Sequence, residues 1–351
     1  MNIGVFLPNW VGDVVMATPT LRALRRHFAP PDRLVGIMRP YVADVLAGTH
    51  WLDESLLYDP RSSAAELRGW RFVRQLRRAR LSTVVLLTNS LRTGWLAYAS
   101  GAGERIGYVR YGRGPLLNRK LYPPREGRRL RPTPAVDYYL DLAYALDCPG
   151  ESPQMELATL PRDEQAADAV WAKLRLPPGE RVVVFNSSGA YGAAKLWPAE
   201  YFAELARRVA SAEDRHVLVI CGPNEREIAR EIVYRSGDRR VVSLADESLS
   251  IGLSKACVRR AGLLVTTDSG PRHFAAAFDV PVITLFGPTH IAWSETHYAG
   301  AIHLQREVPC GPCQQRVCPL AHHRCMRELS VDQVYASVES LLRPRRSARA
   351  A

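Results

Sequence analysis

The sequence lacks any long apolar run. Nowhere do about 18 hydrophobic residues follow one another, the length that a membrane-spanning helix needs. The N-terminus has no basic region ahead of its first apolar residues, and that apolar start is interrupted by Gly12 and Asp13. We therefore expect neither a membrane span nor a signal peptide, and a cytoplasmic chain with reduced thiols.

Acidic residues are scarce relative to basic ones. The 351 residues include 35 Asp and Glu against 47 Lys and Arg, which gives a formal net charge of +12. Such an excess attracts phosphorylated substrates, anionic membrane surfaces or nucleic acid. A nucleic-acid partner is not expected, because the sequence has no recognition-helix motif and no basic strands interleaved with aromatic residues.

Short apolar runs alternate with helical patterns along most of the chain, which predicts an α/β protein with covered parallel sheets. Strands are expected at 3–7, 34–38 and 83–87, and helices at 14–28, 66–79 and 133–146, in a first domain of residues 1–155. After a break rich in Pro and Gly, strands at 181–185, 216–221, 240–243, 263–266 and 282–286 indicate a second domain of residues 156–328. A helix and a basic tail are expected over 329–351.

Residues 101–131 differ from their surroundings in charge. Nine Arg or Lys stand there against two Glu, together with six Gly and three Pro. The pattern predicts a long basic loop. As a cluster these side chains suit an anion, whereas most of them taken singly suit an ordinary solvated surface.

Two loops that follow predicted strands carry groups suited to a phosphate. Asp268, Ser269 and Gly270 lie between a strand and a helix, where backbone N–H groups and the helix dipole favour an anion. The loop over residues 186–198 ends in Lys195 and is not a Walker loop, because its glycine spacing differs. The alternative for both is an ordinary capped turn.

Further polar groups follow other predicted strands. Asp13 lies at the start of the first helix, where it is either a functional acid or an acid that favours the helix dipole. Glu225 and Glu227 begin a later helix and could accept hydrogen bonds from ribose hydroxyls, or serve only as first-turn acids. In open α/β sheets ligands bind at the carboxyl ends of strands, which is where all these loops are expected.

Four segments together resemble glycosyltransferase family 9, the heptosyltransferases. They are residues 10–13, residues 191–198, Asp268-Ser269-Gly270 with His273, and residues 318–329. The resemblance spans nearly the whole chain. It implies the GT-B glycosyltransferase fold, in which two Rossmann-like domains face a central cleft, with the acceptor in the N-terminal domain and an ADP-sugar in the C-terminal one.

The resemblance also implies roles for single residues. Asp13 would be the general base, and Lys195 would clamp the diphosphate and assist catalysis. Glu225 would contact the ribose, with Glu227 as the alternative. The other donor-binding residues would be Ser187, Ser188, Ser248, Asp268, Ser269, Gly270 and His273, and the acceptor-binding residues Trp10, Gly12, Arg110, Arg113 and Arg119.

The implied reaction is an inverting transfer of heptose from ADP-heptose to a phosphorylated lipid A–core acceptor at the inner membrane face, without a metal or a cofactor. The net charge suits such an acceptor. A related enzyme with another nucleotide sugar or acceptor is the main alternative, because Pro271-Arg272 replaces an apolar pair usual in the family. A catalytically silent relative is disfavoured by the presence of Asp13, Lys195 and His273. The sequence does not determine the oligomeric state.

Four of the seven cysteines are clustered. Cys310, Cys313, Cys318 and Cys325 lie within sixteen residues, with His322 and His323 among them. This density is typical of structural zinc or iron–sulfur sites, although the spacing matches no standard finger. A structural metal, unbound reduced thiols and a redox disulfide all remain open.

Overall fold

The computed structural model describes residues 1–189 and 191–342. Ala190 and residues 343–351, which include the basic tail expected at the C-terminus, lie outside the described residues. The chain divides into unit 1, Met1–Ala158 with Ala292–His297, and unit 2, Thr159–Ile291 with the chain from Tyr298 onward. The division after Ala158 lies three residues beyond the expected boundary. Within the described residues no helix is long and apolar enough to cross a membrane.

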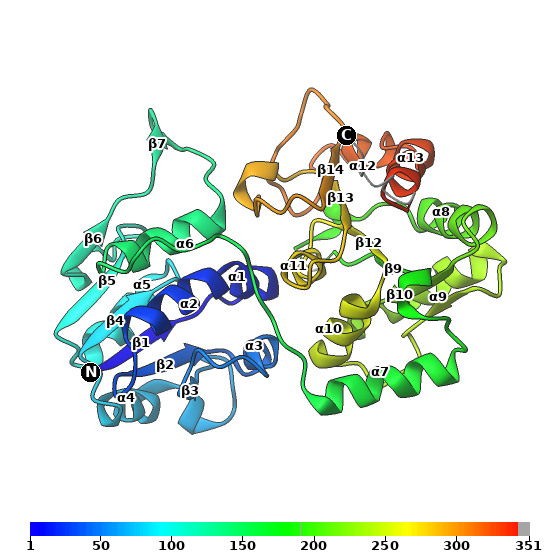
Figure 1. Ribbon diagram of the computed structural model, residues 1–351. Coiled ribbons are helices and arrows are strands. Elements are labelled where there is room, and N and C mark those ends of the chain that lie inside the picture. Colours follow the sequence, from blue (N-terminus) through cyan, green and yellow to red (C-terminus); the bar gives the residue numbers. More distant parts are fainter. Residues whose placement is uncertain (190, 343–351) are drawn as a thin grey trace, which may run out of the picture. The chain divides into compact units, whose positions relative to one another are not determined.

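Unit 1 is built on a six-stranded parallel sheet (Figure 1). The strand order is β3-β2-β1-β4-β5-β6, so the direction in which strands are added reverses between β1 and β4. Polar loops at the carboxyl ends of strands meet at such a reversal. The strands are β1 (Asn2–Phe6), β2 (Arg33–Met38), β3 (Glu54–Leu57), β4 (Thr83–Leu86), β5 (Glu104–Tyr108) and β6 (Arg119–Leu121).

Helices cover both faces of this sheet. On one face α2 packs against α6, and α1 packs against α3. The other face is covered by α4 and α5, whose apolar residues join those of the strands in one core. The helices are α1 (Val11–Met16), α2 (Thr18–His27), α3 (Pro40–Leu46), α4 (Gly69–Arg78), α5 (Leu91–Ala99) and α6 (Ala135–Tyr144).

The single helix expected at 14–28 is two helices. Ala17 ends α1, and Pro19 lies in the first turn of α2. Proline has no N–H and cannot continue an existing helix, but it fits a first turn. The apolar spacing runs through the break unchanged, which is why it predicted one helix.

The prediction of a long basic loop over residues 101–131 is wrong for much of that stretch. Residues 104–108 and 119–121 are the strands β5 and β6 of the sheet, and β7 (Arg125–Glu126) and β8 (Arg129–Leu130) form a small antiparallel hairpin. Ile106 and Tyr108 are buried inside the sheet. The density of charge around these short apolar stretches concealed them in the sequence.

Unit 2 repeats the same topology. Its parallel sheet has the order β11-β10-β9-β12-β13-β14, with the reversal between β9 and β12. The strands are β9 (Val182–Asn186), β10 (His216–Ile220), β11 (Val241–Ser243), β12 (Leu263–Thr267), β13 (Val282–Phe286) and β14 (Ala301–Gln305). β9 and β12 are buried at every position, as central strands covered on both faces must be.

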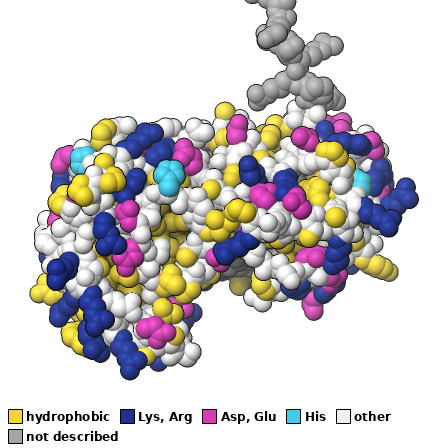
Figure 2. Space-filling model, turned by 60° about the horizontal axis from the view of Figure 1, so that its bottom comes forward, with side chains coloured by type: hydrophobic (Ala, Val, Ile, Leu, Met, Phe, Trp, Pro, Cys, Tyr) yellow, Lys and Arg dark blue, Asp and Glu magenta, His cyan; other side chains and the backbone are white. Residues whose placement is uncertain are grey.

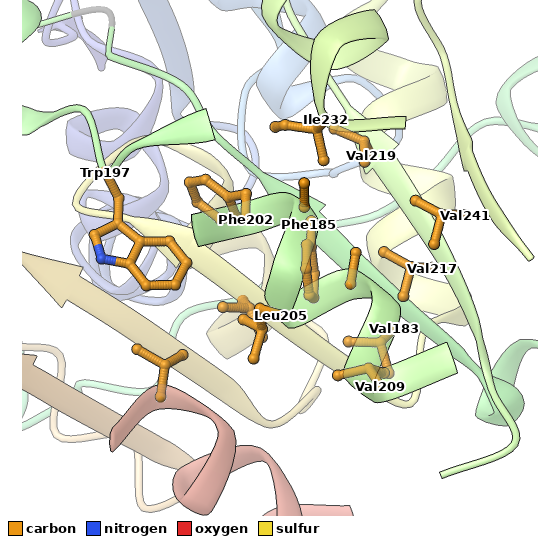
Figure 3. Packing of buried hydrophobic residues seen from close by; sticks show 14 of the residues in the cluster. Val183, Phe185, Trp197, Phe202, Leu205, Val209, Val217, Val219, Ile232 and Val241 are labelled. Carbon is orange, nitrogen blue, oxygen red and sulfur yellow. The ribbon is translucent and has the colours of Figure 1, made fainter. Parts of the chain in front are cut away.

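The core of unit 2 lies between its sheet and the helices α8, α9 and α13. Phe185 and Phe202 pack beside the fully buried Trp197, whose Nε1 donates to the carbonyl of Leu329 at 2.9 Å (Figure 3). Val334 and Val338 of α13 belong to this core, so the helix expected near the C-terminus is part of unit 2. The helices are α7 (Pro161–Lys173), α8 (Ala199–Ala212), α9 (Arg226–Ser236), α10 (Ile251–Arg260), α11 (Pro271–Ala277), α12 (Arg324–Arg327) and α13 (Val331–Leu342).

Candidate active site

A buried ion pair joins two loops at the carboxyl ends of the central strands of unit 2. Lys195 ends the loop that follows β9, and Asp268 follows β12. The Nζ of Lys195 donates to Oδ2 of Asp268 at 2.5 Å and to its carbonyl oxygen at 3.0 Å. Both side chains are at most a tenth exposed. A charge this deeply buried is tolerated only when it is paired, so each residue holds the other in place.

Asp268 is surrounded by donors beyond Lys195. Thr289, in the loop after β13, donates its hydroxyl to Oδ2 at 2.7 Å, and the guanidinium of Arg272 lies 3.6 Å from Oδ1. Burial alone would raise the pKa of Asp268, but Lys195, Arg272 and Thr289 outweigh burial and hold this pKa at about 2. The site therefore keeps a fixed carboxylate between two cations.

His273 lies in α11 close to this pair. It is buried, and burial together with the charge of Arg272 lowers its pKa well below the usual range, so its imidazole is neutral. Its Nδ1 has no hydrogen-bond partner among the described residues. A buried polar atom in this condition is uncommon in native proteins and is consistent with a ligand contact.

Hydroxyl groups line the same ends of β9 and β12. Asn186 donates from Nδ2 to Thr266 Oγ1 at 2.8 Å and to Ser269 Oγ at 2.7 Å, which ties the two strands together. Ser187 and Ser188 follow Asn186 and are buried. The hydroxyl of Ser187 lacks a partner in the described residues, so it too can serve a ligand.

Glu225 connects two loops of unit 2. Its carboxylate accepts from Gly222 N at 2.8 Å and from Gly189 N at 3.2 Å, so it braces the loop that leads to Lys195. Glu227 is exposed on the first turn of α9. Of the two acids, Glu225 is the one that contacts the loop after β9, and it already has internal partners.

The loop over residues 246–249, which carries the expected donor-binding residue Ser248, is held by an arginine. Arg226 donates to the carbonyl oxygens of Ala245 and Glu247, and Ser248 follows these residues with an exposed side chain. Arg226 belongs to no motif that pointed to a donor site. Its position one residue after Glu225 was the only available signal.

Asp13 lies in unit 1 in the first turn of α1, after β1. Tyr139 of α6 donates its hydroxyl to Asp13 Oδ1 at 2.9 Å. Tyr139 is buried, and burial together with Asp13 raises its pKa well above the usual value, so the phenol remains a donor. Helix α6 thus positions the carboxylate of Asp13. Because Asp13 is partly exposed, solvent or a ligand can still reach it.

A pocket of about 340 Å³ lies at the carboxyl ends of the strands of unit 1. Asn9, Arg39, Thr88, Ser90 and Arg92 are among its lining residues. Trp10 is half exposed beside Asn9, and Gly12 is buried inside α1. Arg39 and Arg92 belong to no motif, so the sequence did not indicate them.

Comparison with known proteins identifies the family. The family model described as glycosyltransferase family 9 (heptosyltransferase) matches residues 69–323. The chain belongs to glycosyltransferase family 9. It is 23% identical to lipooligosaccharide heptosyltransferase 2 of Campylobacter jejuni, across 98% of this chain and 100% of that protein. It is 30% identical to lipopolysaccharide heptosyltransferase 1 of Pseudomonas aeruginosa, across 75% of this chain and 71% of that one.

A solved relative supports the fold. The structure of the E. coli ADP-heptose lps heptosyltransferase II superposes with a TM-score of 0.77 at 21% identity, covering 97% of this chain and 98% of that one. The chain therefore has the GT-B fold, as its motifs predicted. Because it belongs to family 9, the protein is a glycosyltransferase.

The three arginines expected to bind the acceptor of this glycosyltransferase differ in their exposure and in their internal contacts. Arg113 is fully buried and donates to the carbonyl oxygens of Tyr108 and Thr88 and, at 3.0 Å, to Asn89 Oδ1. Its contacts are internal, so a direct contact with the acceptor is not available to it. Arg119 pairs with Glu104 Oε1 at 2.9 Å and Asp147 Oδ2 at 3.3 Å.

Arg110 keeps an accessible guanidinium. It is partly exposed, lies 5.0 Å from the ring centroid of Tyr111 and donates to that phenol at 3.1 Å. Of the three, Arg110 is the one whose surroundings still suit an anionic ligand.

Replacing Arg113 by alanine is expected to lower the free energy of unfolding of unit 1 by about 2–4 kcal/mol, because three buried acceptors lose a charged donor. Burial lowers the pKa of Arg113 to about 10, so the side chain is still charged at neutral pH. Denaturant unfolding would measure the loss. Arg110→Ala is the matched control and should change stability by about 0.5 kcal/mol or less. Equal stability of the two variants would contradict the internal role.

The four clustered cysteines follow β14 and are free thiols. Cys310 Sγ lies 3.9 Å from His322 Nε2, and backbone N–H groups, that of His323 foremost, lower the pKa of Cys318. Burial and the neighbouring thiols raise the pKa of Cys325. Among the described residues no three His, Cys, Asp or Glu side chains are arranged to hold a metal ion.

The cysteine segment also supports the Lys195 loop. Ala194 donates from its backbone N to the carbonyl oxygen of Arg316 at 3.0 Å. A side chain at Gly192 would place its Cβ 2.2 Å from that same oxygen, so only glycine permits this contact. The segment thus has a structural function beside the donor loop.

Proposed function

We propose that this enzyme transfers heptose from ADP-heptose to the inner core of lipopolysaccharide, with inversion at the anomeric carbon and without a metal. Membership of family 9 and the names of its relatives support this donor and acceptor. The observation that carries the proposal is the buried Lys195–Asp268 pair with Arg272, since such a fixed set of charges suits an ADP-sugar.

The donor would bind across the loops of unit 2. As the anomeric bond breaks, negative charge grows on the diphosphate, and Lys195 and Arg272 would stabilise it in a site where both are already fixed. Asp268 would repel a phosphate, so its carboxylate would accept hydrogen bonds from sugar hydroxyls. His273, Ser187, Ser188, Ser269 and Gly270 would complete the contacts to the donor, Glu225 would bind the ribose, and Ser248 would lie beside the adenine.

Asp13 would act as the general base. An ionised carboxylate is too weak a base to remove an alcohol proton in advance, so it would accept the proton while the acceptor oxygen attacks the sugar. The hydrogen bond from Tyr139 supports this role, because it orients the carboxylate. The reaction requires Asp13 to reach the anomeric carbon when both substrates are bound.

The acceptor would bind to unit 1. The pocket at the carboxyl ends of the strands of unit 1 contains Arg39 and Arg92, which suit the phosphates of a lipid A–core acceptor, and Arg110 would add a further contact. Trp10 and Gly12 would shape the entrance. Such an acceptor is lipid-linked, so the enzyme would work in the cytoplasm at the surface of the inner membrane.

Calorimetric titration of ADP and UDP at equal salt tests the donor. We expect ADP to bind at least about tenfold more tightly, which corresponds to 1.4 kcal/mol, because only the adenine would contact the loop held by Arg226. Equal affinities, or tighter UDP binding, would exclude ADP-heptose and favour the alternative, a family 9 enzyme with another nucleotide sugar.

A further inference from the structure

One stretch of unit 1 carries positive charge without any negative charge. Residues 67–103 include seven arginines and no Asp or Glu. Four of the arginines, Arg71, Arg74, Arg77 and Arg78, lie on α4 and are exposed, and Arg92 is exposed on α5. The local excess of positive charge therefore attracts anions to this part of the surface.

The same two helices expose large apolar side chains. Trp70 of α4 is 58% exposed, and on α5 Leu91, Trp95 and Tyr98 are 54%, 46% and 59% exposed. Leu91, Trp95 and Tyr98 recur at intervals of four and three residues, which places them on one side of the helix. Apolar groups gathered in this way on a surface mark an interaction site.

The charged and the aromatic residues belong to one continuous surface. Arg77 of α4 donates from Nε to the carbonyl oxygen of Ala99 of α5 at 2.9 Å, so the helices lie side by side. A groove of about 580 Å³ runs between them and is lined by Trp70, Arg71, Arg92 and Trp95. Figure 2 shows Lys and Arg side chains among hydrophobic ones over unit 1, on the left of the view. We call this surface the α4–α5 face.

Three arginines of this face, Arg71, Arg74 and Arg78, are exposed. Elsewhere in unit 1, Arg39 pairs with Asp59 and Arg119 with Glu104. In the part of the chain that the structure describes, Arg71, Arg74 and Arg78 form no ion pair. An anionic partner would not have to displace an internal carboxylate.

We propose that the α4–α5 face docks onto an anionic lipid bilayer. Arginines would contact lipid phosphates, while Trp70, Trp95, Tyr98 and Leu91 would enter the region between headgroups and acyl chains, where amphipathic rings are favoured. A bilayer explains the aliphatic Leu91 as well as the rings, whereas RNA would use only the rings and the cations. The docking rests on this surface alone and not on the identity of the sugar that the enzyme transfers.

Co-sedimentation of the full chain with vesicles of phosphatidylcholine containing about a third phosphatidylglycerol tests the proposal. Arg71→Gln, Arg74→Gln and Arg78→Gln combined should weaken binding on the order of 100-fold, at roughly a factor of five for each cation. The matched control removes three exposed arginines from unit 2, by Arg162→Gln with Arg175→Gln and Arg239→Gln, and should bind like the wild type.

The aromatic part of the face has its own test. Trp70→Ser with Trp95→Ser should weaken vesicle binding about tenfold or more, also at high salt, where the arginines contribute least. Tyr234→Ser, which removes an exposed ring from unit 2, is the control and should have no effect.

Two results would overturn the proposal. One is vesicle binding of the arginine triple variant that equals that of its control. The other is binding of wild type to a single-stranded RNA oligonucleotide at the same salt that is tighter than to vesicles and is lost in the same variants, which would assign the face to nucleic acid. Transfer to a deacylated, water-soluble acceptor should be unchanged in the triple variant, so a failure of the docking and a failure of the proposed function give different results.

Discussion

Replacing Asp13 by asparagine is expected to reduce transfer by roughly 10²–10⁴-fold, the range that loss of a general base usually produces. The asparagine keeps the shape of the side chain and an oxygen that can accept from Tyr139, but it cannot take the proton of the acceptor hydroxyl. Initial rates with saturating donor and acceptor would measure the loss.

The same variant should leave binding and folding almost unchanged. ADP contacts are expected in unit 2, so the calorimetric affinity for ADP should equal that of the wild type. If Asp13 served only the first turn of α1, stability would fall by about 0.5–1 kcal/mol and activity would be kept. Retained transfer would therefore remove the catalytic role from Asp13.

A matched change at Tyr139 separates positioning from chemistry. Tyr139→Phe removes the hydroxyl that donates to Asp13 Oδ1 and leaves the carboxylate in place. We expect a smaller loss, about tenfold, because a misplaced base still functions part of the time. A loss as large as that of Asp13→Asn would mean that the phenol itself takes part in the proton transfer.

Replacing Lys195 by methionine is expected to lower kcat by about 10²–10³-fold and to weaken donor binding as well. The charge on the leaving diphosphate grows toward the transition state, so a fixed cation stabilises that state more than the bound substrate. Steady-state kinetics would separate the two effects. A change in KM alone would show that Lys195 binds ground state and transition state equally.

The buried pair complicates a single substitution. Without Lys195, the carboxylate of Asp268 would lose its nearest cation and keep Thr289 and the more distant Arg272, and the protein should lose about 3 kcal/mol of stability. A loss of activity could then follow from damage to the fold.

A double-mutant cycle with Asp268→Asn resolves this ambiguity. If Lys195 only neutralises Asp268, Lys195→Met should cost little further activity once Asp268→Asn has removed that charge. If Lys195 stabilises the diphosphate, the loss of about 10²-fold or more should appear in both backgrounds. Stability should recover in the double variant in either case.

The central strands of both units and the edge strand β11 could be predicted from the sequence, whereas the edge strands β3 and β14 could not. β9 and β12 are buried at every position and read as continuous apolar runs. β3 and β14 are partly exposed along their length, because an edge strand has a neighbour on one side only, and they lack such runs. β5 and β6 were hidden for a different reason, since their apolar residues stand among arginines.

The residues of the candidate site also divide into those that the sequence predicted and those that it did not. Asp13, Lys195, Asp268 and His273 could be found because each belongs to a local motif after a predicted strand. Thr289 and Tyr139 could not, although they donate to Asp268 and Asp13, because neither belongs to a motif. Tyr139 is 126 residues away from the acid that it positions.

By itself the sequence determined two α/β units, their strand-end loops and the family, because these depend on apolar spacing and on residues close together in the chain. Only the tertiary structure decided which charges meet. It paired Lys195 with Asp268, 73 residues apart, buried Arg113 inside unit 1, and joined α4 and α5 into one basic and aromatic face. Pairing and burial arise from packing between distant segments, and no local pattern records them.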